Sequence, residues 1–107
     1  MVICCCLVVG SLLTAARLFA RHNVTINSIQ PGSFETDRQK AGLARTAAQR
    51  GVTIDAALAE SKARIPAGRF GDPAEFGALC AFLAGAQAGF ITGQNILIDG
   101  GAFPGAV

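Results

Sequence analysis

Two short strand-like segments, separated by a long stretch of helical pattern, constrain the fold of this chain more than any other feature. Val24 to Ile29 alternates and is rich in β-branched residues, while Gln94 to Ile98 is short, apolar and closed by the turn residues Asp99-Gly100-Gly101. Because helices lie between them, the two strands should run parallel and be joined by a crossover. The expected fold class is α/β, with two parallel strands and covering helices.

Four helices are predicted around these strands. They span about Cys6 to His22, Thr36 to Arg50, Thr53 to Arg64, and Asp72 to near Gly85. The last has the clearest start, because Asp72 is a capping acid, Pro73 suits the first helical position and Glu75 follows three residues after the cap. Its apolar residues Phe76, Leu79, Cys80 and Leu83 should face a core.

Charge is uneven along the chain. Thirteen of the sixteen charged residues lie between Glu35 and Glu75, so the middle should be solvated and the apolar ends buried. Basic and acidic residues are interleaved, which argues against a nucleic-acid partner. Val2 to Leu13 is apolar but shorter than the roughly 20 residues of a membrane span, and it lacks the basic flank of a signal peptide. We expect a buried helix there and no membrane partner; a membrane-surface anchor is a weaker alternative.

The cysteines and the single histidine do not form a recognisable site. Cys4, Cys5 and Cys6 are adjacent and Cys80 is distant, which fits neither a disulfide framework nor zinc-ligand spacing. We therefore expect no metal, and a reducing, cytoplasmic location. His22 has a sufficient structural role at the end of the first helix, where a cation favours the helix dipole. The absence of tyrosine removes the phenol that many oxidoreductases use as a proton donor.

A two-stranded parallel sheet is narrower than such sheets normally are. The segment Val24 to Ile29 should therefore expose an edge that another strand or chain would fill. A chain of 107 residues holds one core at most and gains little stability from it. Self-association or a complementary chain is the expected partner.

Four motifs occur together in one order and spacing. They are Asn27-x-x-x-Pro31-Gly32-x-x-x-Thr36, Arg69-Phe70-Gly71-Asp72-Pro73-x-Glu75, Phe82-Leu83, and Thr92-Gly93 followed by Asp99-Gly100-Gly101. Each is weak alone, but in register they resemble the C-terminal portion of the short-chain dehydrogenases/reductases, and the overall pattern is most similar to the 3-oxoacyl-carrier-protein reductase-like members. The resemblance covers essentially the whole chain.

This resemblance implies a single partial domain over residues 1–107, the far edge of a Rossmann-like doubly wound parallel sheet that binds NAD or NADP. By analogy, Pro31 and Gly32 would let the backbone approach the nicotinamide, while the Phe34 backbone and the Thr36 hydroxyl would bond its carboxamide. The alternative interpretation is a Pro-Gly turn followed by a helix-capping threonine. Residues 36–65 would form lid-like helices over a small carbonyl or alcohol substrate.

The chain lacks two motifs that the family uses to bind the cofactor and to catalyse the reaction. No glycine-rich turn follows a strand, and the run Gly85, Gly89, Gly93 precedes one instead, so we interpret it as a loop. By the family's spacing, its catalytic tyrosine and lysine would fall on Met1 and Cys5. We therefore expect no catalytic residue and no tightly bound cofactor in this chain, which would be a truncated, inactive fragment of an NAD(P)-dependent oxidoreductase.

A second hypothesis is a non-catalytic oligomerisation or interaction module. In the family, the helix matching Cys6 to His22, the last helix and the last strand contribute to subunit interfaces. Their apolar surfaces would be exposed on a monomer of this chain, so a partner should cover them.

Overall fold

The computed structural model describes residues 2–3 and 9–105, which belong to two compact units. Of the described residues, the first unit contains those up to Pro31 together with Ala74–Ile98, and the second contains Gly32–Pro73 together with those from Asp99 to Gly105. The chain therefore leaves the first unit after Pro31 and returns to it at Ala74. In the described part of the chain, no helix combines the length and the apolar character needed to cross a membrane.

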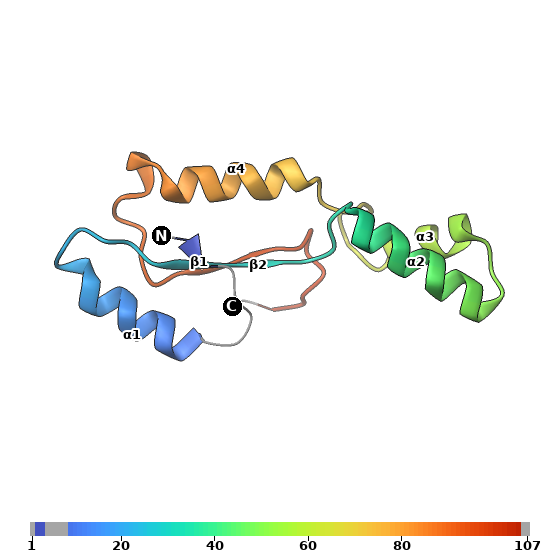
Figure 1. Cartoon of the computed structure of the whole chain (residues 1–107), viewed down its shortest axis with the longest axis horizontal. Coiled ribbons are helices and arrows are strands. Elements are labelled where there is room, and N and C mark those ends of the chain that lie inside the picture. Colours follow the sequence, from blue (N-terminus) through green and yellow to red (C-terminus); the bar gives the residue numbers. More distant parts are fainter. Residues whose placement is uncertain (1, 4–8, 106–107) are drawn as a thin grey trace. The chain divides into compact units, whose positions relative to one another are not determined.

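The first unit contains a three-stranded parallel sheet. Its strands are β1 (Val2–Ile3), β2 (Asn27–Pro31) and β3 (Asn95–Ile98), in the order β1-β2-β3 (Figure 1). Ser28 of β2 lies opposite Asn95 of β3, and the pairing continues to Pro31 and Ile98. The predicted parallel pair is thus confirmed, and β1 adds a short strand at the other side of β2.

Two sequence expectations about these strands were wrong in detail. β2 begins at Asn27 rather than Val24, because the Ile26 amide donates to the Thr92 hydroxyl and the Ile26 carbonyl accepts from the Gly93 amide. The Ile26 backbone is thus hydrogen-bonded to the loop before β3 and not to a strand. The strand also continues through Pro31, whose carbonyl can still accept a hydrogen bond although its nitrogen carries no proton.

The apolar N-terminal segment is also divided differently from the prediction. We expected one buried helix there, whereas Val2–Ile3 pairs in parallel with Asn27 and Ser28. Two β-branched residues favour extended backbone, and the edge of β2 offers them hydrogen-bond partners. Helix α1 begins at Val9 and ends at Ala20, followed by Asn23 with a positive φ of 57°. Asn tolerates this left-handed conformation, as predicted for the helix stop.

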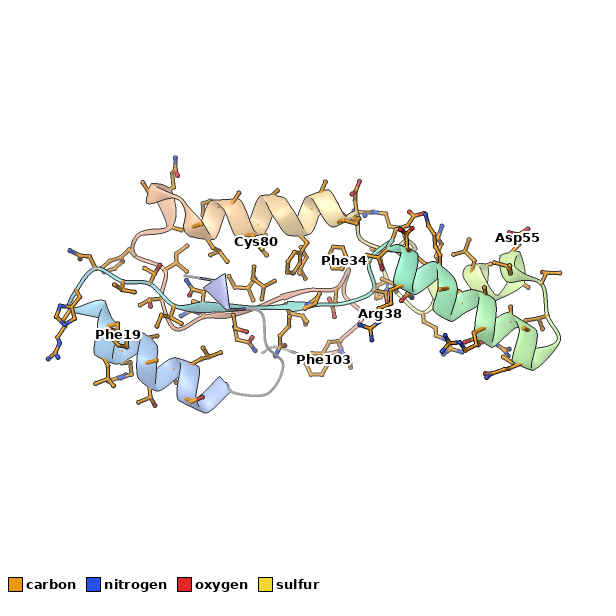
Figure 2. All side chains as sticks on the ribbon, in the orientation of Figure 1. Phe19, Phe34, Arg38, Asp55, Cys80 and Phe103 are labelled. Carbon is orange, nitrogen blue, oxygen red and sulfur yellow. The ribbon has the colours of Figure 1, made fainter. Side chains whose placement is uncertain are left out.

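Helices α1 and α4 (Pro73–Ala84) lie on opposite faces of the sheet (Figure 1). On the α4 face, buried Ile29, Leu83 and Ala88 form the core. Phe76, Leu79 and Cys80 pack against it, so the predicted core face of this helix is confirmed (Figure 2). The following segment, interpreted from its glycines as a loop, contains one short 3-10 turn, η1 (Ala86–Ala88).

Helix α1 is less buried than its apolar sequence predicts. Ala16 is 1% exposed, but Leu18 is 60% and Phe19 is 50% exposed. The expectation that the apolar ends are buried is therefore wrong for α1. The apolar residues of α1 form a wide face that includes Leu13, Leu18 and Phe19, and the sheet covers only a part of it.

The second unit contains a pair of helices, α2 (Asp37–Arg50) and α3 (Ile54–Ala63). The Thr36 and Thr53 hydroxyls accept hydrogen bonds from Gln39 N and Ala56 N, both at 3.2 Å, and so cap the two helices. Gly51 ends α2 with a φ of 66°. These predicted starts and stops are confirmed. The core of the pair consists of Leu43, Ile65 and Phe70, with Leu58 packed against them.

One ion-pair cluster links the two helices. Glu60 of α3 contacts Arg50 Nη1 at 2.7 Å and Arg64 Nη2 at 2.6 Å through its two carboxylate oxygens. The hydrogen bonds from Arg50 and Arg64 hold the pKa of Glu60 below its usual value. Because Arg50 is at the end of α2, this cluster joins the two helices at that end.

We expect the stability of the helix pair to decrease in acid through Glu60. The folded-state pKa is lowered, so the stabilisation is present above the unfolded-state pKa of about 4.3 and is lost as pH falls through the folded-state pKa. Thermal unfolding of wild type and Glu60→Gln should therefore differ at pH 7 and converge as the pH falls through the folded-state pKa of Glu60. High salt should shrink the difference at pH 7, because the pairs are exposed. A difference that persists unchanged in acid would contradict this assignment.

Candidate functional site

The candidate site is the loop that leaves β2 and leads into α2. Pro31 is the last residue of the first unit, whereas Gly32, Phe34 and Thr36 belong to the second. The structure therefore places three of the four residues predicted to bind the cofactor on one short segment of the second unit. Their neighbours there come from two distant parts of the chain.

A backbone bridge to Gly71 fixes the middle of this loop. Gly71 N donates to the Ser33 carbonyl at 2.9 Å, and Glu35 N donates to the Gly71 carbonyl at 2.8 Å, on either side of Phe34. The Phe34 ring lies against Gly71 so closely that a Cβ built there would be 2.5 Å from a ring carbon. Phe34 is labelled in Figure 2, just before α2. The bridge and the ring contact together restrict where the Phe34 backbone can lie.

A second close approach fixes the start of the loop. A Cβ on Gly32 would lie 2.6 Å from both Cα and Cβ of Asp99. Asp99 is itself held, because its carboxylate accepts from Gly101 N at 2.9 Å and from Phe103 N at 2.7 Å. Position 32 therefore requires glycine for packing within the protein, whether or not a ligand also approaches it.

The Thr36 hydroxyl caps α2 and can still donate a hydrogen bond of its own. Its Oγ1 accepts from Gln39 N, which uses the oxygen as a cap but does not consume the hydroxyl proton. Its own amide donates to the Phe34 carbonyl at 2.9 Å, and a carbonyl oxygen can accept two hydrogen bonds. One acceptor and one donor are therefore placed two residues apart at the start of α2.

Asn27, the first motif residue, serves the first unit. It is 3% exposed, its Nδ2 donates to the Ile91 carbonyl at 2.8 Å, and its Oδ1 accepts from Gln94 N at 3.0 Å. Together with the bonds of Ile26 to Thr92 and Gly93, this ties the start of β2 to the loop before β3. The motif residues of the first unit thus hold its two longer strands in register.

The residues that would match the family's catalytic tyrosine and lysine are a methionine and a cysteine. Met1 and Cys5, which would match the family's tyrosine and lysine, lie outside the described residues, as do Cys4 and Cys6. His22 is exposed, and its Nε2 accepts from Arg21 Nε at 3.1 Å. Among residues 2–3 and 9–105, no three His, Cys, Asp or Glu side chains come together as a metal site would require.

Comparison with known proteins identifies the family of this chain. The sequence is 38% identical over 96 residues to the 3-oxoacyl-(acyl-carrier-protein) reductase FabG of Vibrio cholerae, which covers 90% of this chain and 35% of that protein. The family model described as enoyl-(acyl carrier protein) reductase matches residues 6–102. The chain belongs to the short-chain dehydrogenase/reductase family. Within it, the chain is 3-oxoacyl-carrier-protein reductase-like, as the motifs predicted.

A further relative and a solved structure support the assignment. The NADPH-dependent reductase BacG of Bacillus subtilis is 37% identical over 83 residues, or 78% of this chain and 32% of that protein. The solved structure of a short-chain dehydrogenase family protein from Francisella tularensis matches with a TM-score of 0.83 and 27% identity, covering 89% of this chain and 39% of that one. The Rossmann-like α/β fold is therefore confirmed. The chain spans about a third of the length of the curated relatives it matches.

Sequence reasoning named the loop residues but missed the residues that hold them. Gly71 and Asp99 were recognised only as parts of turn and capping motifs, whereas both contact the loop directly. The signal was present, because both lie in motifs that accompany Pro31-Gly32 in the same order. The sequence does not show that these motifs contact the loop in the folded protein.

Proposed function

We propose that this chain provides the nicotinamide-facing loop and the substrate lid of an NAD(P)-dependent short-chain dehydrogenase/reductase, corresponding to the family's C-terminal portion. The intact enzyme would transfer hydride between the cofactor and a small carbonyl or alcohol substrate. The observation that carries the proposal is the loop Gly32–Thr36, held by its bridge to Gly71 with an acceptor and a donor side by side. The names of the relatives support it, since FabG is a reductase and BacG is NADPH-dependent.

The two polar groups of the loop fit a nicotinamide carboxamide. The Phe34 carbonyl would accept from the carboxamide NH2, and the Thr36 hydroxyl would donate to the carboxamide oxygen while it still caps α2. Gly32 has no side chain and Pro31 has no backbone N–H, so both would let the ring approach the backbone. When bound, the nicotinamide would supply or accept the hydride, and this loop would orient it. Helices α2 and α3, over residues 36–65, would form the lid.

This chain alone is proposed to be inactive. Reduction of a carbonyl requires a proton for the alkoxide oxygen, and the sequence has no tyrosine to deliver it. By the family's spacing, Met1 and Cys5 would take the positions of the tyrosine and lysine, and a methionine side chain exchanges no proton. The cofactor would also be bound weakly, because the sequence lacks the glycine-rich turn that holds its phosphates. Four cysteines whose spacing fits neither a disulfide framework nor a zinc site are consistent with a cytoplasmic location.

Titration of the full chain with NADPH tests the role of Thr36. We expect weak binding, with amide NMR shifts centred on Phe34 and Thr36, and a loss of affinity in Thr36→Ala. Thr53→Ala is the matched control, since Thr53 caps α3 with the same 3.2 Å bond. Both variants should lose about 1 kcal/mol of stability, but only Thr36→Ala should weaken NADPH binding. Thr36→Ser, which keeps the hydroxyl, should bind like wild type.

Two results would overturn the proposed function. Equal NADPH affinity in wild type and Thr36→Ala, or no shift in the loop at saturating NADPH, would remove the loop from the cofactor site. Oxidation of NADPH by the purified chain with a carbonyl substrate, above the rate without enzyme, would refute the proposed inactivity.

The exposed apolar surface favours a second candidate function, an oligomerisation module. In α1, Leu13, Leu18 and Phe19 are 49%, 60% and 50% exposed, and Phe82 and Phe90 are 47% and 103% exposed in and after α4. Large apolar side chains gathered on a helix mark association surfaces in other proteins. Sedimentation should then give a dimer or larger species that Leu18→Glu or Phe82→Glu dissociates. A stable wild-type monomer would exclude this function.

A further inference from the structure

A small hollow in the first unit lies between helix α1 and the sheet. Its volume is about 50 Å³. Leu12 and Leu13 line it from α1, Ser28 lines it from β2 and Asn95 lines it from β3. Gly93 brings the helix close to the sheet at this point, because a Cβ built on Gly93 would lie 3.1 Å from Leu13 Cδ1. The hollow thus has a helix on one side and two paired strands on the other.

Two of the residues that line the hollow carry buried polar atoms. Ser28 is 4% exposed, and both its Oγ and the Oδ1 of Asn95 are buried. Neither atom has a hydrogen-bond partner among the described residues. Ser28 and Asn95 lie opposite each other in the parallel register, and Ile29, the next residue, points into the core on the α4 face. Side chains alternate along a strand, so the Ser28 side chain lies on the α1 side of the sheet.

Water is the molecule that best suits these two atoms. A buried hydroxyl or carbonyl without a partner costs free energy, so such groups normally bond to protein or to ordered water. The serine hydroxyl can donate and accept, whereas the asparagine oxygen can only accept. A water molecule does both, and it needs roughly 10–15 Å³ of space and two or more polar partners. Rotation about one bond, between staggered positions, is enough to turn a serine hydroxyl toward a neighbouring water.

We propose that this hollow is an internal hydration site that holds one to about three water molecules, one of which bridges the Ser28 hydroxyl and Asn95 Oδ1. The bridge would join β2 to β3 on the face of the sheet that α1 covers. The site lies in the first unit and includes none of Gly32, Phe34 and Thr36. It therefore stands whether or not the proposed cofactor role is correct.

A crystal structure of the full chain tests the occupancy of the site. We expect an ordered water within hydrogen-bond distance, roughly 2.7–3.2 Å, of both Ser28 Oγ and Asn95 Oδ1. Two results would overturn the proposal. One is a direct hydrogen bond between the two side chains with no water beside them, and the other is a hollow without solvent density.

Two substitutions of nearly the same shape test the water in solution. Ser28→Thr and Ser28→Val both place a β-branched residue in β2, and they differ only in whether the side chain keeps the hydroxyl. If the hydroxyl binds water, Ser28→Val should melt about 5 °C below Ser28→Thr. If no water is bound, the unpartnered hydroxyl should make Ser28→Thr the less stable of the two. Equal melting temperatures, or this reversed order, would overturn the proposal.

The same comparison with Asn95→Leu tests the bridge itself. Asn95→Leu removes the second partner of the water, so the difference between Ser28→Thr and Ser28→Val should shrink by about half or more in this background. A difference of unchanged size would mean that the two side chains do not share a water molecule, and it would overturn the proposed bridge. Thermal unfolding followed by circular dichroism measures all of these variants.

Discussion

Replacement of Gly32 by alanine is expected to lower the free energy of unfolding by about 2–3 kcal/mol, and the melting temperature by roughly 10–20 °C. The added Cβ would lie 2.6 Å from the Asp99 Cα, which is backbone and cannot rotate away. Asp99 is further held by the two amides that its carboxylate binds. Either the loop or the turn must therefore move. Thermal unfolding followed by circular dichroism measures the effect.

Gly42→Ala is the matched control for this substitution. Gly42 lies within α2, and a Cβ there would have no heavy atom within 4 Å. Because alanine favours helix over glycine, this variant should gain roughly 0.5–1 kcal/mol. Opposite signs at the two positions would show that contact with Asp99, and not the loss of glycine flexibility, determines the effect. A neutral Gly32→Ala would refute the close approach.

The second large effect is expected at Ile29, in the centre of β2. Its side chain is 1% exposed and is the largest fully buried one among the described residues. Truncation to alanine removes three carbons from the core that it forms with Leu83 and Ala88, and should cost about 3 kcal/mol. Urea unfolding should show a lower midpoint with little change in slope.

Ile54→Ala provides the comparison for Ile29→Ala. Ile54 is 56% exposed, so the same chemical change removes little buried surface and should cost less than about 1 kcal/mol. Similar costs at both positions would mean that the sheet core is not organised around Ile29.

The helices of the second unit could be predicted well from sequence because their signals are local. Thr36, Thr53 and Gly51 act within one helical turn of their own positions, and the same holds for Pro73 at the start of α4. Their meaning does not depend on the rest of the fold. The predicted bounds therefore agree closely with those observed.

The strands and the exposure of α1 could be predicted only in part, because distant residues determine them. The backbone of Ile26 is hydrogen-bonded to Thr92 and Gly93 and is therefore not part of β2. No residue near Ile26 in the sequence predicts these two bonds. The apolar character of α1 predicted burial, but burial requires a partner surface as well as an apolar side chain. Leu18 and Phe19 lack one within the described part of this chain.

In the candidate site, too, the local features could be predicted from sequence and the long-range contacts could not. The resemblance named Pro31, Gly32, Phe34 and Thr36, and local capping rules gave the role of Thr36 at α2. The contacts that hold the loop, with Gly71 and Asp99, join segments far apart in the sequence. Motif spacing records that such segments occur together but not that they touch. Only the structure supplies that information.

The route of the chain between β2 and β3 has a consequence for the order of folding. Pairing of Ser28 with Asn95 must close a loop that contains the whole of α2, α3 and α4, and closing long loops slows folding. Helices α2 and α3 are joined by a few residues and can dock early through local contacts. Their docking would shorten the effective loop, so we expect the helical hairpin to form before the sheet nucleates, and defects in α2 or α3 to slow the assembly of the strands.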